Sequence, residues 1–352
     1  RVGQNYIHIV FHKKFYHPSN ALFCTAGNIA LSELQTGIND WVLSKYEGQQ
    51  EVNNVHLQSR IEKKQIRTES FPAHSQAAHK AHHLRAWLLA NATNVDEWIM
   101  AKVMSYLLAG DSAAPLMHFL ETTSLGACPS SLTGLHAYFQ QMSFVIGVEQ
   151  SDEHAQKDWE TQIDQLLQTI VKTGFDNERI AAVFDQFELQ LKDRSTNTPH
   201  GIQLLSRCVL PALHDQPIEE YLFLDDALLR CQKKLQDPEN ISNWIKKWLI
   251  DNTHQVILTA IPESKLIQEN TKAIESELED ALSRLSNDAK DELETGEKSL
   301  EERQQSYQDV NVLPTLSLKD LIQKNQIIKP LKTLKNTPQV ALFNTPTHGV
   351  TF

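Results

Sequence analysis

The sequence predicts an α+β protein built in two layers, with a long helical extension towards its C-terminal end. Between residues 47 and 261, candidate strands and amphipathic helices come in groups, which is typical of a sheet covered by helices. Between residues 262 and 311, isolated apolar residues recur at helical spacing among many acids. The chain has 352 residues, 41% of them hydrophobic, so it can form more than one core.

The first 46 residues predict the end of a domain. A helix leads into the turn sequence His17–Asn20, and the apolar residues 21–26 fit a short buried strand. Leu31–Tyr46 is amphipathic and predicts a further helix. The strand has no earlier strand with which to pair. We therefore expect residues 1–46 to be the C-terminal part of a first domain whose beginning lies upstream of Arg1.

Residues 47–261 predict a second α+β domain. Its expected strands are runs of apolar and β-branched residues at 52–60, 64–70, 84–90, 135–150 (interrupted at Gln140-Gln141) and 256–260. Its expected longer helices are amphipathic segments at 95–108, 115–122, 152–173 and 176–194. Asp176 is the expected N-cap of the last of these helices.

Residues 262–311 predict an acidic helical hairpin that acts as a hinge. Apolar residues lie three, four or seven positions apart between Ile267 and Tyr307, which is the narrow seam of a coiled coil. Asn287-Asp288 is the expected break between two antiparallel helices; the alternative is one long surface helix packed on a domain. Residues 312–352 then predict a connector and the first hairpin of a third domain, with Val340–Phe343 as one strand and His348-Gly349 at the turn.

Composition excludes several classes of function. The net charge of −11 argues against nucleic-acid binding, which requires a basic surface. No run of about 18 apolar residues could cross a bilayer, so no membrane partner is expected. The four cysteines form no C-x-x-C pair and predict free buried thiols in a reducing compartment.

Four segments, in order along the chain, resemble one family. They are residues 12–21 with Gly27-Asn28; residues 87–89, 110, 114–116 and 120–126; the connector Leu313-Pro314-Thr315-Leu316; and Thr347-His348-Gly349-Val350. Together they resemble presequence proteases of the pitrilysin, or insulinase-like, zinc metallopeptidases. The sequence departs from that pattern at Ala113-Ala114 and at Thr122-Thr123-Ser124, which weakens close kinship more than it weakens the fold.

The resemblance implies a two-layer metallohydrolase-type fold, like that of the mitochondrial processing peptidases, with a helical-hairpin hinge. It implies a zinc metalloendopeptidase that encloses unfolded peptides, in a bacterial cytoplasm or an organelle matrix. This chain would be its non-catalytic middle portion, with the remaining domains of the same polypeptide as its partners. The alternative is a catalytically dead relative that acts as a structural subunit.

The zinc motif of that family, H-x-x-E-H, does not occur in the chain, so no catalytic or cofactor-binding residue is assigned. His79 and His83 have the same four-residue spacing, but His82 occupies the position of the catalytic glutamate. On a helix the two side chains would share one face and could bind a divalent ion. Because a strand follows directly, a loop without a functional metal is the preferred interpretation. A stand-alone metal-binding module at His74 to His83 is the third alternative.

Overall fold

A computed structural model of the chain describes residues 11–48, 56–73, 80–193, 199–214 and 216–306, short parts of 312–317, and the backbone of 330–334 and 340–343. The chain divides into two compact units, residues 1–269 and 270–352, and we describe each by itself. Among the described residues, no helix has both the length and the apolar character needed to cross a membrane.

The first unit is built around a mixed sheet with strand order β1-β6-β2-β5-β3, and β4 also pairs with β5. The strands are β1 (Gln65–Pro72), β2 (Ala81–Asn91), β3 (Cys128–Pro129), β4 (Gly134–His136), β5 (Gln141–Ser151) and β6 (Gln255–Glu263). β2 is central and antiparallel to both β5 and β6, whereas the edge strand β1 runs parallel to β6. The sheet therefore joins segments nearly 200 residues apart in the sequence.

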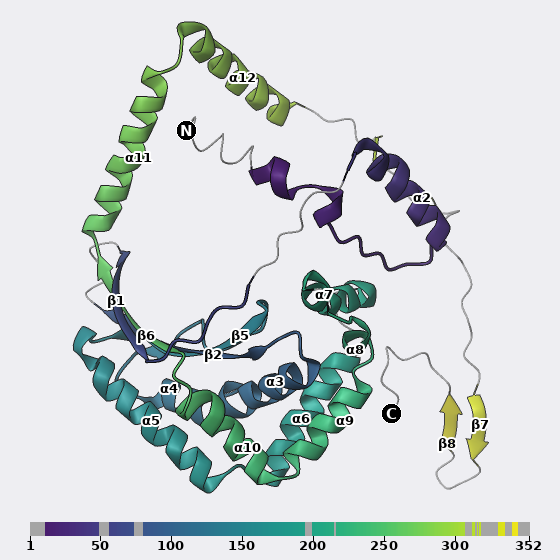
Figure 1. Cartoon of the computed structure of the whole chain (residues 1–352), viewed down its shortest axis with the longest axis vertical. Coiled ribbons are helices and arrows are strands. Elements are labelled where there is room, and N and C mark those ends of the chain that lie inside the picture. Colours follow the sequence, from purple (N-terminus) through teal and green to yellow (C-terminus); the bar gives the residue numbers. More distant parts are fainter. Residues whose placement is uncertain are drawn as a thin grey trace. The chain divides into compact units, whose positions relative to one another are not determined.

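Helices cover one face of this sheet (Figure 1). They are α3 (Val95–Ala109), α4 (Pro115–Thr122), α5 (Gln156–Thr173), α6 (Asn177–Lys192), α7 (His200–Leu213), α8 (Glu219–Leu222), α9 (Asp225–Leu235) and α10 (Pro238–Ile245), followed by a π-helical turn at Lys246–Ile250. α3 lies in the middle of the core, with nine buried residues distributed around its circumference. Asn94 and Asp176 cap α3 and α6 as N-cap acceptors, so the capping prediction for Asp176 is confirmed.

Several sequence predictions differ from the structure. Residues 21–26 are extended but form no strand, because a strand requires a hydrogen-bonded neighbour and none lies beside them among the described residues. The expected strand at 52–60 is absent over residues 56–60, and its first residues lie outside the described ranges. The first helix after residue 30, α2, spans Leu31–Trp41 and ends before the predicted boundary. Cys24 and Cys128 are exposed rather than buried.

The second unit contains most of α11 (Lys265–Ser283), all of α12 (Asn287–Gln305), and the two-stranded sheet of β7 (Pro330–Leu334) and β8 (Val340–Phe343). The two long helices confirm the helical prediction for residues 262–311, but the break falls at residues 284–286 rather than at Asn287-Asp288. Ser286 is the N-cap of α12, because its side-chain oxygen accepts the Ala289 amide. β8 pairs with β7, and the predicted turn at His348-Gly349 lies outside the described residues.

Candidate functional site: the open face of the sheet

The two faces of the central sheet differ in burial but not in polarity. Along β2, Ala81, His83, Arg85, Trp87 and Leu89 are buried against the helices. The residues between them point to the opposite face and are half-exposed. We call this opposite side the open face and define it by seven half-exposed apolar residues: Leu84, Ala86, Leu88, Val145, Val256, Leu258 and Ala260.

Strand register arranges these side chains in rows across the sheet. Ala86 pairs with Val145 on β5 and with Val256 on β6, and Leu84 pairs with Leu258 on β6. On its β5 side Leu84 faces Gly147, where a Cβ atom would lie 2.4 Å from the Leu84 Cδ2 atom. The glycine therefore lets a leucine side chain lie flat against the neighbouring strand.

An apolar open face is unusual for a sheet that includes antiparallel strands. Such sheets commonly alternate apolar residues towards the core with polar residues towards water. Here both alternating positions of β2, β5 and β6 are largely apolar, and the exposed edge strand β1 adds Ile66, which is 59% exposed. Large apolar surfaces of this kind mark interaction sites.

A groove continues the open face at one end. It has a volume of about 930 Å³ and is lined in part by Leu88 and Ser143 of the sheet, and by Tyr138 and Phe139 of the loop between β4 and β5. Tyr138 and Phe139 are 88% and 68% exposed. Sequence patterns did not reveal this pair as part of a site. The adjacent aromatic residues immediately before a strand were the only available signal.

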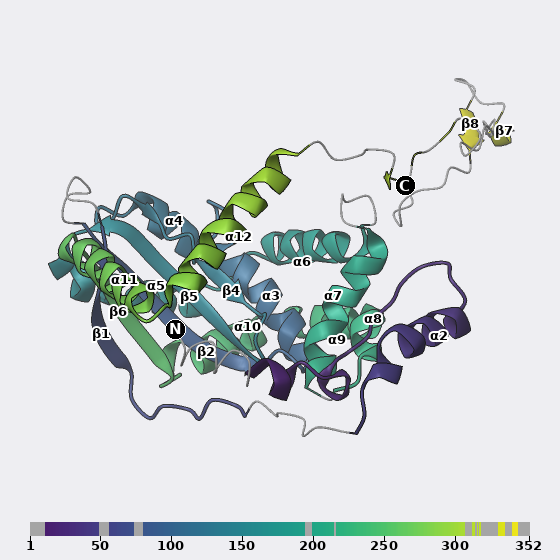
Figure 2. The same cartoon turned by 90° about the horizontal axis from the view of Figure 1, so that it is seen from above.

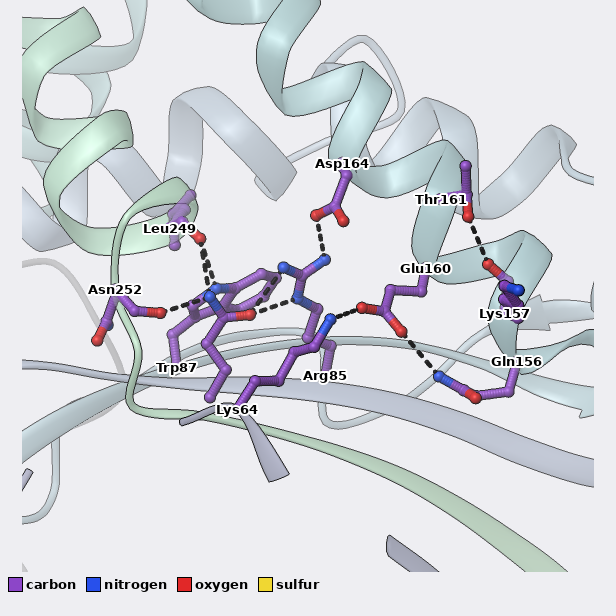
Figure 3. A network of polar contacts seen from close by, with 11 residues as sticks. Lys64, Arg85, Trp87, Gln156, Lys157, Glu160, Thr161, Asp164, Leu249 and Asn252 are labelled. Carbon is purple, nitrogen blue, oxygen red and sulfur yellow. Dashed lines mark hydrogen bonds and ion pairs between the residues drawn. The ribbon is translucent and has the colours of Figure 1, made fainter. Parts of the chain in front are cut away.

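A polar network fixes the covered face of β2 to the helices (Figure 3). The buried Arg85 guanidinium donates to Asp164 on α5 at 2.6 Å and twice to Gln255 on β6, at 2.7 and 3.1 Å. It also lies 4.6 Å from the centre of the Trp87 ring. Trp87 in turn donates its indole N–H to the Leu249 carbonyl at 2.8 Å. Burial lowers the pKa of Arg85, and the bond to Asp164 opposes that shift.

A second ion pair lies beside the first. Lys64, just before β1, contacts the Glu160 carboxylate, whose other oxygen accepts the Gln156 side-chain amide at 2.9 Å. Glu160 is buried, so these contacts satisfy a carboxylate that would otherwise be costly to bury. Both networks connect strands to α5, and neither faces the open side of the sheet. We assign them a structural role.

His83 is one of the two histidines that the sequence suggested as a metal ligand. It is fully buried on β2, and its Nε2–H donates to the Asp152 carbonyl at 2.9 Å. Nδ1 is then the acceptor of the neutral ring and lies 3.1 Å from the Thr259 hydroxyl. Burial lowers the pKa of His83, which agrees with a neutral ring. The lone pair that a metal would require is therefore already used, and the partner, His79, lies outside the described residues.

No group of three or more histidine, cysteine or acidic side chains lies close enough to hold a metal ion within the described part of the chain. His82 lies on the open face, with its ring centre 5.1 Å from that of Phe71. It has no metal-ligating neighbours in the described ranges. Within those ranges, the surface available to a ligand is thus apolar.

Comparison with known proteins agrees with this geometry. Residues 10–187 match the family described as Peptidase M16 inactive domain, and residues 261–352 match the domain associated with subfamily C of the M16 peptidases. The mitochondrial presequence protease of Yarrowia lipolytica is 30% identical over 353 residues, which are 97% of this chain and 35% of that protein. The corresponding enzyme of Danio rerio is 27% identical over 88% of this chain and 31% of its own length. The chain thus spans about a third of these relatives.

Solved structures show the same fold. The peptidase M16 inactive domain from Pseudomonas fluorescens superimposes with a TM-score of 0.54 at 15% identity, over 72% of this chain and 56% of that one. The periplasmic protease PqqL from Escherichia coli gives 0.50 at 17% identity, over 93% of this chain and 34% of its own. The open-faced sheet, the matching family descriptions and the presequence-protease relatives together show that the chain belongs to the M16, or pitrilysin-type, metallopeptidase family.

Proposed function

We propose that this chain is the non-catalytic middle portion of a zinc metalloendopeptidase that encloses and degrades unstructured peptides. The observation that carries the proposal is the apolar open face, which lies on a domain of the inactive type. An unfolded peptide exposes apolar side chains that a folded protein buries. Each such contact stabilises binding by roughly 25 cal/mol per Å² of apolar surface removed from water, without requiring a particular sequence.

In this proposal the open face forms one wall of the enclosing chamber. Leu84, Ala86, Val145, Val256 and Leu258 offer a flat surface formed by three strands, and the groove with Tyr138 and Phe139 extends it. A flat apolar wall retains peptides of many sequences, so the size of the chamber would select the substrates. The helices on the other face keep the wall rigid.

In the same proposal the chain has four parts. Residues 1–46 complete a catalytic-type first domain, 47–261 form the wall, 262–311 form the hinge, and 312–352 begin a third domain. The first assignment is supported by residues 11–46, none of which is buried and among which Phe23, Leu31 and Trp41 are 45%, 66% and 77% exposed. Such a segment requires further protein to cover it.

Zinc would be held by H-x-x-E-H and a downstream glutamate in the upstream part of the polypeptide. There it would activate a water molecule for peptide hydrolysis. This chain would contribute substrate enclosure and gating. The mitochondrial location of the presequence-protease relatives supports an organelle matrix, and a bacterial cytoplasm is the other compartment we propose.

The first test is an assay of the longer polypeptide that contains this sequence. We expect it to cleave unstructured peptides and to lose that activity when zinc is chelated. An intact polypeptide that binds peptides but never cleaves them would instead indicate a catalytically dead relative with a structural role.

The second test addresses the wall itself. Leu84→Glu and Leu258→Glu place charges on the open face and should raise KM for long peptides by about tenfold, since each replaces an apolar contact by a charge. Leu189→Glu on α6 is the matched control, because Leu189 is 51% exposed and lies on a helix. Equal KM values for all three variants would contradict the wall.

A further inference from the structure

α11 and α12 each carry an apolar stripe that is exposed in this structure. Ile274 and Leu278 on α11 are 59% and 38% exposed, and Leu293 and Leu300 on α12 are 59% and 56% exposed. The two helices diverge from the turn that joins them (Figure 1; the turned view is Figure 2). Four large apolar side chains on highly acidic helices require a partner surface.

The two stripes have the same spacing and opposite directions. On α11 and the turn, the stripe residues are separated by four, three and four positions, at Ile274, Leu278, Ala281 and Leu285. On α12 the separations are again four, three and four, at Ala289, Leu293, Gly296 and Leu300. This is the a/d repeat of a coiled coil. Each residue of the first stripe lies as far before Asn287 as its counterpart in the second stripe lies after it.

The sizes of the side chains are complementary in this arrangement. Leu278 would face Gly296, Leu293 would face Ala281, and Leu285 would face Ala289, so a large residue meets a small one three times. Only the outermost pair, Ile274 and Leu300, joins two large side chains. Alternation of large and small residues across facing positions allows close packing. Gly296 has no neighbouring atom within 4 Å of an added Cβ in this structure, so it has no packing role while the helices are apart.

The connection also favours antiparallel packing. Only residues 284–286 separate α11 from α12, and connections this short join antiparallel neighbours. Leu282, 51% exposed beside the stripe, would then lie near Lys290, whose aliphatic stem can cover it.

We propose that α11 and α12 close on each other as an antiparallel pair in this single register, with Leu278 seated over Gly296. The partner of each exposed stripe is thus the other helix of the same chain. This inference rests on the helices alone and holds whether or not the longer protein is a peptidase.

Disulfide trapping in the 352-residue chain tests the register. The exposed Cys24 and Cys128 are first replaced by serine, and Leu278→Cys is combined with Gly296→Cys. The matched control is Ser276→Cys with Gly296→Cys, because Ser276 lies on the opposite side of α11. Under mild oxidation at low protein concentration, we expect the first pair to cross-link within one chain at least about tenfold faster than the control.

A second variant keeps the proposal falsifiable if the first pair perturbs folding. Gly296→Leu fits the open space around Gly296 while the helices are apart, but it fills the position that Leu278 requires. It should slow cross-linking of Ile274→Cys with Leu300→Cys by about tenfold. Equal rates for Ser276→Cys and Leu278→Cys, or cross-links that form only between chains, would overturn the proposal; the latter would make a second copy the partner.

Discussion

Arg85 illustrates how the first unit accommodates charge beneath an apolar sheet. Its guanidinium is buried between β2 and α5, where Asp164, Gln255 and the Trp87 ring occupy its donors and its face. Asp164 remains half-exposed, so the pair is only partly removed from water. Arg85 therefore fixes the position of α5 on the sheet and does not face the open side, where a peptide would bind.

Arg85→Met should destabilise the chain by about 2 kcal/mol, because Gln255 loses two buried donors. Adding Gln255→Leu should recover part of that loss, since no unpaired acceptor then remains. Arg67→Met on the exposed strand β1 is the control and should change stability by less than about 0.5 kcal/mol. Urea unfolding measures all three; an Arg85 variant as stable as the control would contradict the role assigned to the network.

Two histidines should make stability depend on pH. Burial lowers the pKa of His83 and, with the nearby Arg60, the pKa of His254, whose Nδ1 accepts the Ile61 amide at 3.2 Å. The folded pKa values lie below the ordinary value of 6.5, so the unfolded chain binds more protons just below that pH. The free energy of unfolding should therefore fall as pH decreases from 6.5 towards the folded pKa values.

His83→Gln should lower stability overall but weaken this pH dependence, since the glutamine amide can still donate to the Asp152 carbonyl without titrating. His154→Gln is the control, because the His154 side chain is 85% exposed. The measurement is a series of urea unfolding curves between about pH 5 and 7 at constant ionic strength. A slope that His83→Gln leaves unchanged would show that other groups cause it.

At the scale of elements, β2 decides the architecture of the first unit. It is hydrogen-bonded on both sides, carries the buried network on one face, and supplies three residues of the open face on the other. β5 can lie close beside it because Gly147 has no side chain. Two neighbours, the Leu84 Cδ2 atom at 2.4 Å and the His83 carbonyl oxygen at 2.7 Å, occupy the place of its missing Cβ.

Gly147→Ala should destabilise the chain by about 2 kcal/mol, because the backbone oxygen of His83 cannot move aside as a leucine side chain can. Combining it with Leu84→Ala should not restore stability, since the backbone contact remains. Gly37→Ala in α2 is the matched control, with open space around the added Cβ, and should not destabilise. Thermal or urea unfolding compares the variants; a neutral Gly147→Ala would contradict this close approach.

At the scale of the whole molecule, the chain carries an apolar sheet face but not the zinc motif of its family. Its relatives are about three times longer, and the family description that matches residues 10–187 is that of an inactive domain. The open face, the exposed residues of 11–46 and the exposed stripes of α11 and α12 are all apolar surfaces. We propose that the remainder of the polypeptide covers the first two, and that the two helices cover each other.

The 352-residue chain alone should therefore cleave no unstructured peptide, and a zinc chelator should change nothing. The physical reason is the absence of H-x-x-E-H from its sequence. A fluorogenic peptide assay with and without chelator measures this, and the longer polypeptide is the positive control. Turnover by a purified chain that chelation abolishes would refute the prediction.

The sequence by itself determined the local elements and the family. Apolar periodicity and capping residues are local signals, so α4 was predicted to the residue, α3 and α6 to within two residues, and the two long helices in all but the position of their break. The ordered motifs identified the pitrilysin-type family because each reflects a short local geometry.

Tertiary structure alone decided which faces are covered and what each polar residue does. His83 is a structural residue because Thr259, far along the chain, meets its ring, and residues 21–26 form no strand because no neighbour lies beside them among the described residues. Likewise, the apolar open face becomes visible only when β2, β5 and β6 lie side by side. Pairing between distant segments is a non-local property, and local sequence patterns do not encode its partners.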